Sequence, residues 1–338
     1  MMMQFGIIGS GSWATALAKI LTDSQHRINW WIRNGATIDY IKQRHHNPHY
    51  LPAAYFDKSL LTMSDDVQQI IQNSDVLIVA VPSAFVKPAF AGIPENIFRN
   101  KKIVSAIKGI LPDCNELLND YLVEKFKVNI SQYFTVLGPC HAEEIAAEKL
   151  SYLTFSGVDE EMAGIIAKHF NTKYVNTIVN HDIIGVQYAA VLKNIYALGA
   201  GIAHGLDYGD NFLSVYITNC ANEMTVFLKK LVQQHKIPCN GERITYTSSV
   251  YLGDLLVTCY SLYSRNRMFG SMIGKGYSVK AAQLELSMVA EGYNASKCVF
   301  IANKQVSAET PIAEAIYRVL WEQYPAKEAF KNIEPLLV

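Results

Sequence analysis

The 338-residue sequence predicts an α/β N-terminal domain with a mostly parallel sheet over residues 1–183, followed by an all-α C-terminal domain over residues 184–338. In the first half, short apolar runs alternate with helix-like stretches, which is typical of a parallel sheet with helical crossovers. From about residue 181 the strand-like runs fade, and long stretches with helical periodicity replace them. A chain of this length also favours two domains.

The first strand and helix flank a glycine-rich turn. The apolar run 5–8 predicts a buried strand, and Gly9-Ser10-Gly11-Ser12-Trp13-Ala14 leads from it into a helix. A strand, a glycine turn and a helix in this order are typical of the dinucleotide-binding turn of a Rossmann domain. We expect Gly9 to make the tight turn, Gly11 to admit a pyrophosphate and Ala14 to keep the helix close to the sheet. The alternative is an ordinary glycine turn before a helix.

The second strand is expected at 27–32, and the residues after it bear on the choice of cofactor. A site selective for NAD places an acidic residue about 20 positions past the glycine motif, where it binds the ribose 2′-hydroxyl. This chain has Arg33 and Asn34 there instead. A guanidinium suits a 2′-phosphate, which favours NADP(H). Arginine can also stack on adenine, so NAD(H) is compatible, and a plain surface arginine is the alternative.

Three more apolar runs rich in β-branched residues predict strands that are buried on both faces of a sheet. They cover residues 75–83, 102–107 and 133–137. In parallel sheets ligands bind beyond the carboxyl ends of the strands. Ser83, Lys108 and the turn 138–141 are expected at that edge.

Helical periodicity in the second half predicts helices over 184–198, 212–234, 279–303 and 311–321. Some of these stretches are apolar on more than one side, as in residues 188–192. Such helices pack against several neighbours, which predicts a helical bundle and favours a homodimer.

Charge and cysteine usage exclude several classes of protein. Thirty basic and thirty acidic side chains balance, so no global field attracts nucleic acid or an anionic membrane, and any anion site must be local. No apolar run reaches membrane-spanning length, and the apolar start is interrupted by the glycine turn, unlike a signal peptide. The six cysteines are scattered without a C-x-x-C pair, which predicts free thiols in a reducing cytoplasm.

Histidines cluster at one place in the chain, at His45, His46 and His49. No carboxylates or cysteines with matching ligand spacing accompany them. We therefore expect no metal.

Several segments in the right order carry a resemblance to one family. They are 9–18 around the glycine turn, Leu192-Lys193-Asn194-Ile195-Tyr196-Ala197 with 200–202 and 209–211, Gly253-Asp254 through Ser264-Arg265-Asn266-Arg267 to Gly270, Val289-Ala290-Glu291-Gly292, and also 47–52 and 138–144. The sequence resembles the NAD(P)-dependent glycerol-3-phosphate dehydrogenases along essentially its whole length. The Ser-Arg-Asn-Arg block is far more specific than a glycine turn.

The resemblance implies reversible NAD(P)H-dependent reduction of dihydroxyacetone phosphate to sn-glycerol 3-phosphate, a precursor of phospholipids. Lys193 matches the lysine that donates the proton in reduction and accepts it in oxidation. A lysine does so near neutral pH when burial or neighbouring cations lower its pKa, and Lys108 and Arg265 would be such cations. Asp254 is expected to orient Lys193 and the substrate, although its negative charge acts in the opposite direction.

The remaining site residues follow from the same resemblance. Arg265 and Asn266 match the pair that binds the substrate phosphate. The expected catalytic residues are Lys193, Lys108, Asp254 and Thr258. The expected substrate-binding residues are Lys108, Gly138, Cys140, Lys193, Asn194, Asp254, Ser264, Arg265 and Asn266. The expected cofactor-binding residues are Gly9, Gly11, Ser12, Trp13, Arg33, Lys108, Ala142, Arg265, Val289 and Glu291.

The chain departs from the family pattern at one turn, where the usual Gly-Pro-Ser-Phe reads Gly138-Pro139-Cys140-His141. A thiol is a poor hydrogen-bond donor, so Cys140 replaces a serine contact only weakly. His141 beside the site could tune the pH optimum.

Other interpretations of these residues stay open at this point. Lys193 could reach the surface along an apolar helix, Asp254 could only cap a helix, and the arginines could form a solvated turn. For the whole chain, the alternatives are another two-domain reductase of a hydroxy acid and a non-catalytic NAD(P)-binding redox sensor.

Overall fold

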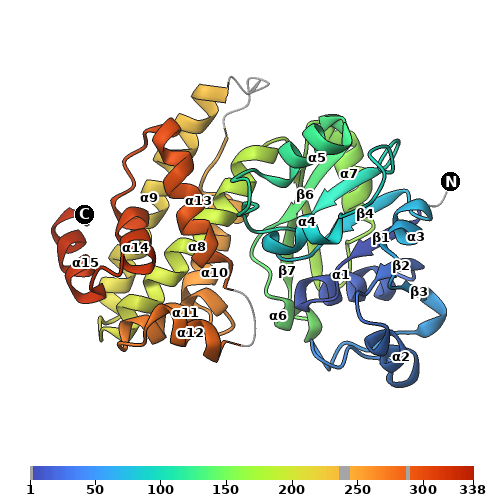
Figure 1. The fold of residues 1–338 in the computed structure, drawn as a ribbon, viewed down its shortest axis with the longest axis horizontal. Coiled ribbons are helices and arrows are strands. Elements are labelled where there is room, and N and C mark those ends of the chain that lie inside the picture. The colour runs from blue at the N-terminus through green and yellow to red at the C-terminus, as the bar shows by residue number, and fades with distance from the viewer. Residues whose placement is uncertain (1–2, 236–243, 287–289) are drawn as a thin grey trace. The chain divides into compact units, whose positions relative to one another are not determined.

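The computed structural model describes residues 3–235, 244–286 and 290–338. The chain forms two compact units. Unit 1 consists of Met1–Ile107 and Glu116–Ile183, and unit 2 consists of Lys108–Asn115 and Ile184–Val338. Within the described residues all strands belong to unit 1, and unit 2 is built of helices (Figure 1).

A single eight-stranded sheet forms the centre of unit 1. Its strands are β1 (Phe5–Ile8), β2 (Ile28–Trp31), β3 (Leu61–Ser64), β4 (Val76–Val79), β5 (Lys102–Ser105), β6 (Tyr133–Leu137), β7 (Ser151–Gly157) and β8 (Val175–Asn180). The order is β3-β2-β1-β4-β5-β6-β7-β8, and only the β6–β7 pair is antiparallel. The chain runs outward from β1 to β3 on one side and returns to β4 on the other. The carboxyl ends of β1 and β4 therefore form the switch point at which such sheets bind ligands.

The predicted mostly parallel sheet is confirmed, including the five strands expected from apolar runs. Those strands are buried at almost every position, and most of their residues are therefore apolar, which makes them visible in the sequence. Strands β3 and β8 were not expected, because their residues are mostly half-buried or exposed and carry polar side chains. Strand β7 was missed because its sequence SYLTFSG mixes polar and apolar residues although most of it is buried.

Helices and short turns connect these strands. They are α1 (Ser12–Asp23), α2 (Gly35–Arg44), η1 (Lys58–Leu60), α3 (Val67–Gln72), η2 (Ser83–Phe85), α4 (Val86–Ala89), α5 (Leu118–Phe126), η3 (Ile130–Gln132), α6 (Ala142–Ala146) and α7 (Glu160–Lys168). Apolar side chains of α1, α6 and α7 share one hydrophobic core with alternate residues of the strands, such as Phe5 and Ile7 of β1. Because α1 is packed into this core along most of its length, its first turn is held at the end of β1.

Unit 2 is an assembly of helices (Figure 1). They are α8 (Ile183–Gly205), α9 (Asp210–His235), the π-helical turn η4 (Ser249–Gly253), α10 (Asp254–Tyr260), α11 (Arg265–Gly274), α12 (Val279–Glu285), α13 (Glu291–Val306), α14 (Pro311–Trp321), α15 (Ala326–Ile333) and η5 (Glu334–Leu336). Helix α8 is long and apolar enough to span a membrane by length and composition, but 89% of its most apolar window is buried inside the protein. The expectation that no apolar run reaches membrane-spanning length is therefore wrong by length and composition, and it is the burial of α8 that is typical of a core helix.

Three of the four helices expected in this half are confirmed, at α8, α9 and α14. The helix expected over 279–303 is wrong, because α12 ends at Glu285 and α13 begins at Glu291. Leu286 and Ala290 have extended backbone angles on either side of the interruption. The backbone N–H of Gly292 donates to the side chain of Asn266, so a tertiary contact engages the start of α13. Periodicity along the sequence carries no signal for such a contact.

Helices α8 and α11 cross with their backbones in contact. Gly201 and Gly205 on α8 face Gly270 and Gly274 on α11, and both pairs have a spacing of four residues. A Cβ atom at Gly270 would clash with the carbonyl oxygen of Leu198, and one at Gly201 would clash with that of Arg267. Only glycine permits this approach. The crossing brings the first turn of α11 to the middle of α8.

Candidate active site

The two glycines of the dinucleotide turn have different surroundings. Gly9 has a φ angle of +125°, and a Cβ there would lie 2.7 Å from the carbonyl oxygen of Ala80 at the end of β4. The fold itself therefore requires glycine at this position. Gly11 has an ordinary φ of −74°, and a Cβ there would meet no described protein atom within 4 Å. The space above Gly11 is therefore open to a ligand, as a pyrophosphate requires.

Helix α1 begins at Ser12 without a capping side chain. Gly11 is its N-cap, and the first turn carries no acidic residue. Ser12 and Ala14 are buried, and Ala14 packs into the core of unit 1. Since the positive end of the helix is not neutralised by a side chain of its own first turn, it can attract an anion.

Around the turn between β2 and α2 the structure places a cation and a carboxylate. Arg33 is exposed directly after β2, while the neighbouring Asn34 caps α2 by accepting the N–H of Ala36. A carboxylate oxygen of Asp65, which follows β3, lies 3.9 Å from the position of a Cβ on Gly35. Sequence reasoning missed Asp65 because β3 was not expected beside β2. This region therefore holds an acidic residue that follows β3 as well as the cation that follows β2.

The turn after β6 contains the sequence Gly-Pro-Cys-His, at which the chain departs from the family pattern. Gly138 has a φ angle of +127°, and a Cβ there would lie 2.8 Å from the carbonyl oxygen of Tyr152, so glycine is required by the β6–β7 pairing. The thiol of Cys140 is buried and donates to the carbonyl oxygen of Gly138 at 3.0 Å. His141 is the N-cap of α6, and Ala142 is its first residue. The thiol thus makes a bond within its own turn.

Within unit 2, three predicted catalytic side chains meet in a buried cluster. The Nζ atom of Lys193 on α8 donates to Oδ1 of Asp254 at 2.5 Å and to Oγ1 of Thr258 at 3.1 Å. All three residues are at most 4% exposed. The interpretation in which Lys193 reaches the surface is therefore wrong. Because a buried charge is costly unless it is paired, the lysine and the aspartate must be held together by the fold.

Helix α10 presents Asp254 and Thr258 on one face, one helical turn apart. The hydroxyl of Thr258 also donates to the backbone carbonyl oxygen of Asp254 at 2.6 Å. Gly253 is the N-cap, and the side chain of Asp254 makes no capping bond. The interpretation of Asp254 as a simple helix cap is therefore wrong. The π-helical turn η4, a type of distortion that is frequent at functional sites, comes immediately before it.

The two carboxylate oxygens of Asp254 have different surroundings. Its Oδ2 atom is buried and, among the residues that the structure describes, has no hydrogen-bond partner. A buried carboxylate oxygen without a partner is costly, which points to a hydroxyl donor that binds there. Burial raises the pKa of the adjacent Cys259 to about 12, although the positive charges of Lys193 and Arg267 act to lower it. Cys259 therefore stays a neutral thiol.

A chain of amide hydrogen bonds runs beside this cluster. Asn194 donates to the carbonyl oxygen of Lys108 and accepts from Nδ2 of Asn266, both at 2.9 Å. The other end of Asn266 accepts the N–H of Gly292, also at 2.9 Å. A Cβ at Gly292 would lie 2.5 Å from the carbonyl oxygen of Asn194, so glycine is required there as well. Gly292 was missed as a site residue, although its place after Glu291 in the sequence was a signal.

The start of α11 carries the predicted substrate residue Ser264 and the predicted phosphate ligand Arg265. Ser264 is its N-cap and accepts the N–H of Arg267, so its hydroxyl has a structural partner. Arg265 is the first residue of α11 and is half-buried. Arg267, which sequence reasoning left without a role, donates from Nη1 to the carbonyl oxygen of Tyr260 at the end of α10. It thereby links α11 to α10, the helix that carries Asp254 and Thr258 of the cluster.

Two predicted cofactor residues lie close together in sequence near the start of α13. Glu291 is the first residue of that helix and is half-buried. Val289 lies outside the described residues.

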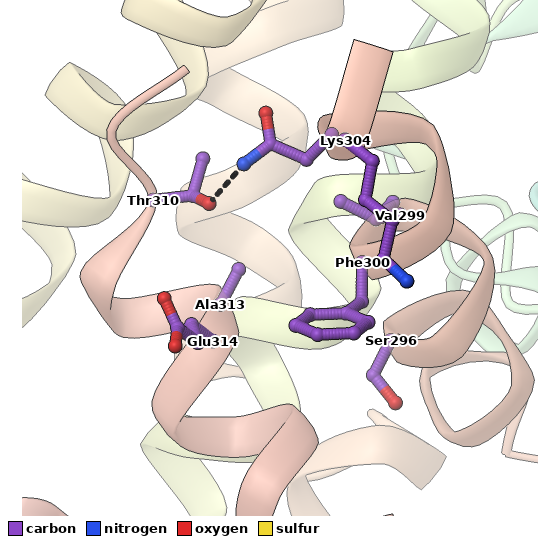
Figure 2. Close-up of a pocket in the computed structure, with 8 residues that line it drawn as sticks. Ser296, Val299, Phe300, Lys304, Thr310, Ala313 and Glu314 are labelled. Atoms are coloured by element: carbon purple, nitrogen blue, oxygen red, sulfur yellow. Dashed lines mark hydrogen bonds between the residues drawn. The ribbon is translucent and has the colours of Figure 1, made fainter. Parts of the chain in front are cut away.

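A cavity of about 150 Å³ lies between α13 and α14 (Figure 2). It is lined by Ser296, Val299, Phe300, Asn303, Lys304, Thr310, Ala313 and Glu314. Figure 2 shows the bond that Thr310 accepts, and Nδ2 of Asn303 is its donor at 2.9 Å. None of the predicted site residues lines this cavity, so it is separate from the buried cluster.

Comparison with known proteins finds similarity along nearly the whole chain. Family models described as the N-terminus and the C-terminus of NAD-dependent glycerol-3-phosphate dehydrogenase match residues 4–163 and 182–331. Glycerol-3-phosphate dehydrogenase (NAD(P)+) of Macrococcus caseolyticus is 32% identical over 333 residues, which cover 98% of each chain. The enzyme of the same name from Chlorobium phaeobacteroides is 32% identical over 98% of this chain and 97% of its own. The crystal structure of glycerol-3-phosphate dehydrogenase from Coxiella burnetii superposes with a TM-score of 0.86 at 25% identity, over 98% of both chains.

Proposed function

Because the chain belongs to the NAD-dependent glycerol-3-phosphate dehydrogenase family, we propose that it catalyses the reversible NAD(P)H-dependent reduction of dihydroxyacetone phosphate to sn-glycerol 3-phosphate. One observation in unit 2 supports this most strongly. A buried lysine is paired with an aspartate and a threonine, and the second oxygen of the aspartate has no partner among the described residues. A ketone reduction needs these groups, namely a proton donor and an acceptor that orients the substrate's hydroxyl group.

Each residue of the cluster has a role in this reaction. The bound cofactor supplies the hydride. Lys193 delivers a proton from Nζ to the oxygen that was the carbonyl, and it accepts that proton in the reverse direction. Asp254 binds the ammonium group of Lys193 through Oδ1, and its Oδ2 accepts a hydrogen bond from the free hydroxyl of the substrate. Thr258 fixes the direction of Nζ through a second bond. Lys108, whose carbonyl oxygen anchors Asn194, contributes a further positive charge beside the substrate.

The phosphate of the substrate is assigned to Arg265 and Asn266. A guanidinium binds phosphate oxygens with two parallel hydrogen bonds, and an amide adds a directional donor. Asn194 and Ser264 complete the proposed polar lining in unit 2, and Gly138 and Cys140 stay predicted substrate residues. Because the net charge of the chain is zero, the local arginine must supply much of the affinity for a phosphate.

We assign cofactor binding to residues 1–183 and substrate binding and catalysis to residues 184–338, to which the segment Lys108–Asn115 is added. Gly9, Gly11, Ser12, Trp13, Arg33 and Ala142 of unit 1 are the proposed cofactor residues, with Lys108, Arg265, Val289 and Glu291 from the rest of the chain. The open space above Gly11 and the uncapped start of α1 fit a pyrophosphate.

The preference for NADP(H) is proposed to depend on Arg33, while Asp65 keeps NAD(H) acceptable. Arg33→Ser should raise the KM for NADPH roughly tenfold and leave the KM for NADH nearly unchanged, because only the 2′-phosphate loses a charged partner. Asp65→Asn should act in the opposite direction and improve NADPH alone. Steady-state kinetics with both cofactors measures this. Equal effects of Arg33→Ser on the two cofactors would contradict the assignment.

Two further properties belong to the proposal. The apolar helices of the C-terminal half suit a homodimer, and light scattering at several concentrations measures its mass. The described cysteines are free thiols, which suits the reducing cytoplasm, and Cys239 lies outside the described residues. Microscopy of a tagged chain tests the location.

The deciding experiment follows absorbance at the reduced-nicotinamide band with the purified chain. Oxidation of NADPH or NADH that needs dihydroxyacetone phosphate, and that is lost with unphosphorylated dihydroxyacetone, is the expected result. Oxidation with a keto acid instead would indicate a hydroxy-acid reductase. Cofactor binding without turnover on any of these ketones would indicate a redox sensor.

A further inference from the structure

The three carbonyl oxygens of the glycine turn in unit 1 are each held by a buried side chain. The indole N–H of Trp30 donates to the oxygen of Gly9 at 2.7 Å. The amide Nδ2 of Asn47 donates to the oxygen of Ser10 at 3.1 Å, and the hydroxyl of Thr15 donates to that of Gly11 at 2.9 Å. These three donor residues are at most 1% exposed, so the carbonyl groups point into the protein.

Asn47 is the centre of this arrangement. Its Oδ1 atom accepts the backbone N–H groups of His49 and Tyr50, at 3.0 and 3.3 Å. These two donors determine which end of the amide is the oxygen, so Nδ2 must face the turn. Nδ2 also donates to Oγ1 of Thr15 at 3.0 Å. One amide therefore joins the segment after α2, the glycine turn and the first helix.

We propose that Asn47, acting with Thr15, is a positioning residue for the cofactor. It holds the carbonyl oxygens of the turn away from the bound pyrophosphate and leaves the open side of the turn to N–H groups. A carbonyl dipole that pointed toward a phosphate would repel it, whereas N–H groups attract it. A turn held in advance also avoids the entropy loss of ordering it on binding. This inference rests on the proposed function, since it assumes that the turn binds a dinucleotide.

The proposal predicts a specific kinetic pattern. Without the Asn47 amide, the Ser10 peptide can rotate, and cofactor affinity falls. Steps that follow binding do not involve Asn47, so kcat at saturating cofactor and the KM for dihydroxyacetone phosphate stay unchanged. A general loss of folding would instead lower all of these together with the fraction of active enzyme.

Four variants of the full chain test this pattern. Asn47→Ala removes the amide, and Thr15→Val removes one hydroxyl while it keeps the shape of the side chain. Thr15→Ser keeps the hydroxyl and is the matched control. Asn29→Ala controls for the loss of a buried asparagine, because Asn29 donates to Asn73 and Ser74 in the same unit without contacting the turn.

The readouts are the Kd for NADPH by calorimetry, steady-state kinetics and the urea midpoint. We expect Asn47→Ala to raise the Kd at least tenfold and Thr15→Val to raise it about threefold to tenfold, with both controls within twofold of wild type. Unchanged Kd values for Asn47→Ala and Thr15→Val would overturn this inference alone, as would an equal rise in Asn29→Ala. A wild-type chain that binds neither NADPH nor NADH would overturn the proposed function together with the inference.

Discussion

At the scale of single residues, Gly9 and Gly11 lie two positions apart but differ in backbone conformation and in surroundings. The backbone of Gly9 has a positive φ and touches the end of β4, whereas Gly11 has an ordinary φ and open space above it. The fold therefore requires glycine at the first position, whereas no contact among the described residues requires it at the second. Sequence motifs assign both to the same fingerprint.

Substitution by alanine should separate these two roles. Gly11→Ala should leave the free energy of unfolding within about 1 kcal/mol of wild type, because the conformation suits alanine, and should raise the cofactor Kd at least tenfold. Gly9→Ala should cost roughly 2 kcal/mol or more of stability, because of the positive φ and the contact with Ala80. Urea denaturation and cofactor titration measure both. A Gly11→Ala chain with normal cofactor affinity would argue against a pyrophosphate at this turn.

The buried Lys193 makes a second residue-scale prediction. Lys193→Met should lower kcat by about a factor of 1,000, which is within the usual range for a general acid, while the cofactor Kd changes less than twofold. Asp254 then keeps a buried charge without its partner, so the free energy of unfolding should also fall, by roughly 3 kcal/mol. Single-turnover kinetics at a temperature well below the melting transition separates the two effects. A kcat near that of wild type would rule out Lys193 as the proton donor.

At the scale of elements, the contact between α8 and α11 positions the proposed substrate-binding residues. Asn194 lies on α8 and Asn266 on α11, and their hydrogen bond exists because glycines allow the two backbones to touch. The amide chain and the phosphate ligands thus depend on a packing feature that makes no contact with substrate in the proposed mechanism.

Widening this contact should impair substrate binding. Gly270→Ala forces a Cβ against the backbone of Leu198 and should cost about 1–3 kcal/mol of stability. It should also raise the KM for dihydroxyacetone phosphate severalfold while the cofactor Kd is unchanged. Gly209→Ala is the matched control, because a Cβ at Gly209 meets no described atom within 4 Å. If Gly270→Ala behaved like Gly209→Ala, the close crossing would not be needed.

At the scale of the whole molecule, a buried carboxylate joins three helices of unit 2. Glu223 on α9 accepts the N–H groups of Ile312 and Ala313 at the start of α14 and the hydroxyl of Tyr196 on α8. Burial raises the pKa of Glu223 to about 7, although these hydrogen bonds act to lower it. The folded protein therefore binds a proton more readily than the unfolded chain does between the two pKa values.

This raised pKa makes stability depend on pH. The stabilisation is complete below the unfolded pKa of 4.5 and is lost as pH rises through about 7. The free energy of unfolding of Glu223→Gln, measured relative to wild type, should therefore be on the order of 3 kcal/mol higher at pH 8 than at pH 4. Urea denaturation at both pH values measures the difference. An equal change in the two proteins would contradict the raised pKa.

The comparison of Glu223→Gln with wild type also removes the effect of a pair of titrating histidines. Burial lowers the pKa values of His26 and His169, and the charge of His169 also lowers the pKa of His26. Nε2 of His26 and Nδ1 of His169 lie 3.2 Å apart in unit 1. A lowered pKa stabilises the fold above the unfolded value and loses that effect as pH falls, which is opposite in sign to Glu223. Both proteins retain the pair, so only Glu223 contributes to their difference.

The parts of the molecule that were predictable are those whose signal lies in neighbouring residues. The glycine turn is a contiguous motif, and the central strands are apolar at nearly every position because both faces are buried. Candidate residues such as Lys193 and Asp254 could be named from resemblance. Their pairing could not be derived from spacing, since 61 positions separate them.

The sequence by itself determined the two-part architecture, the nucleotide turn and the family to which the chain belongs. Only the tertiary structure decided which groups meet: Asn47 at the glycine turn, Asp65 beside the β2–α2 turn, and Asn266 between Asn194 and Gly292. It also decided that the expected helix over 279–303 is interrupted. The physical reason is the same throughout, because these features depend on contacts between segments far apart in sequence, and local periodicity and composition carry no information about them.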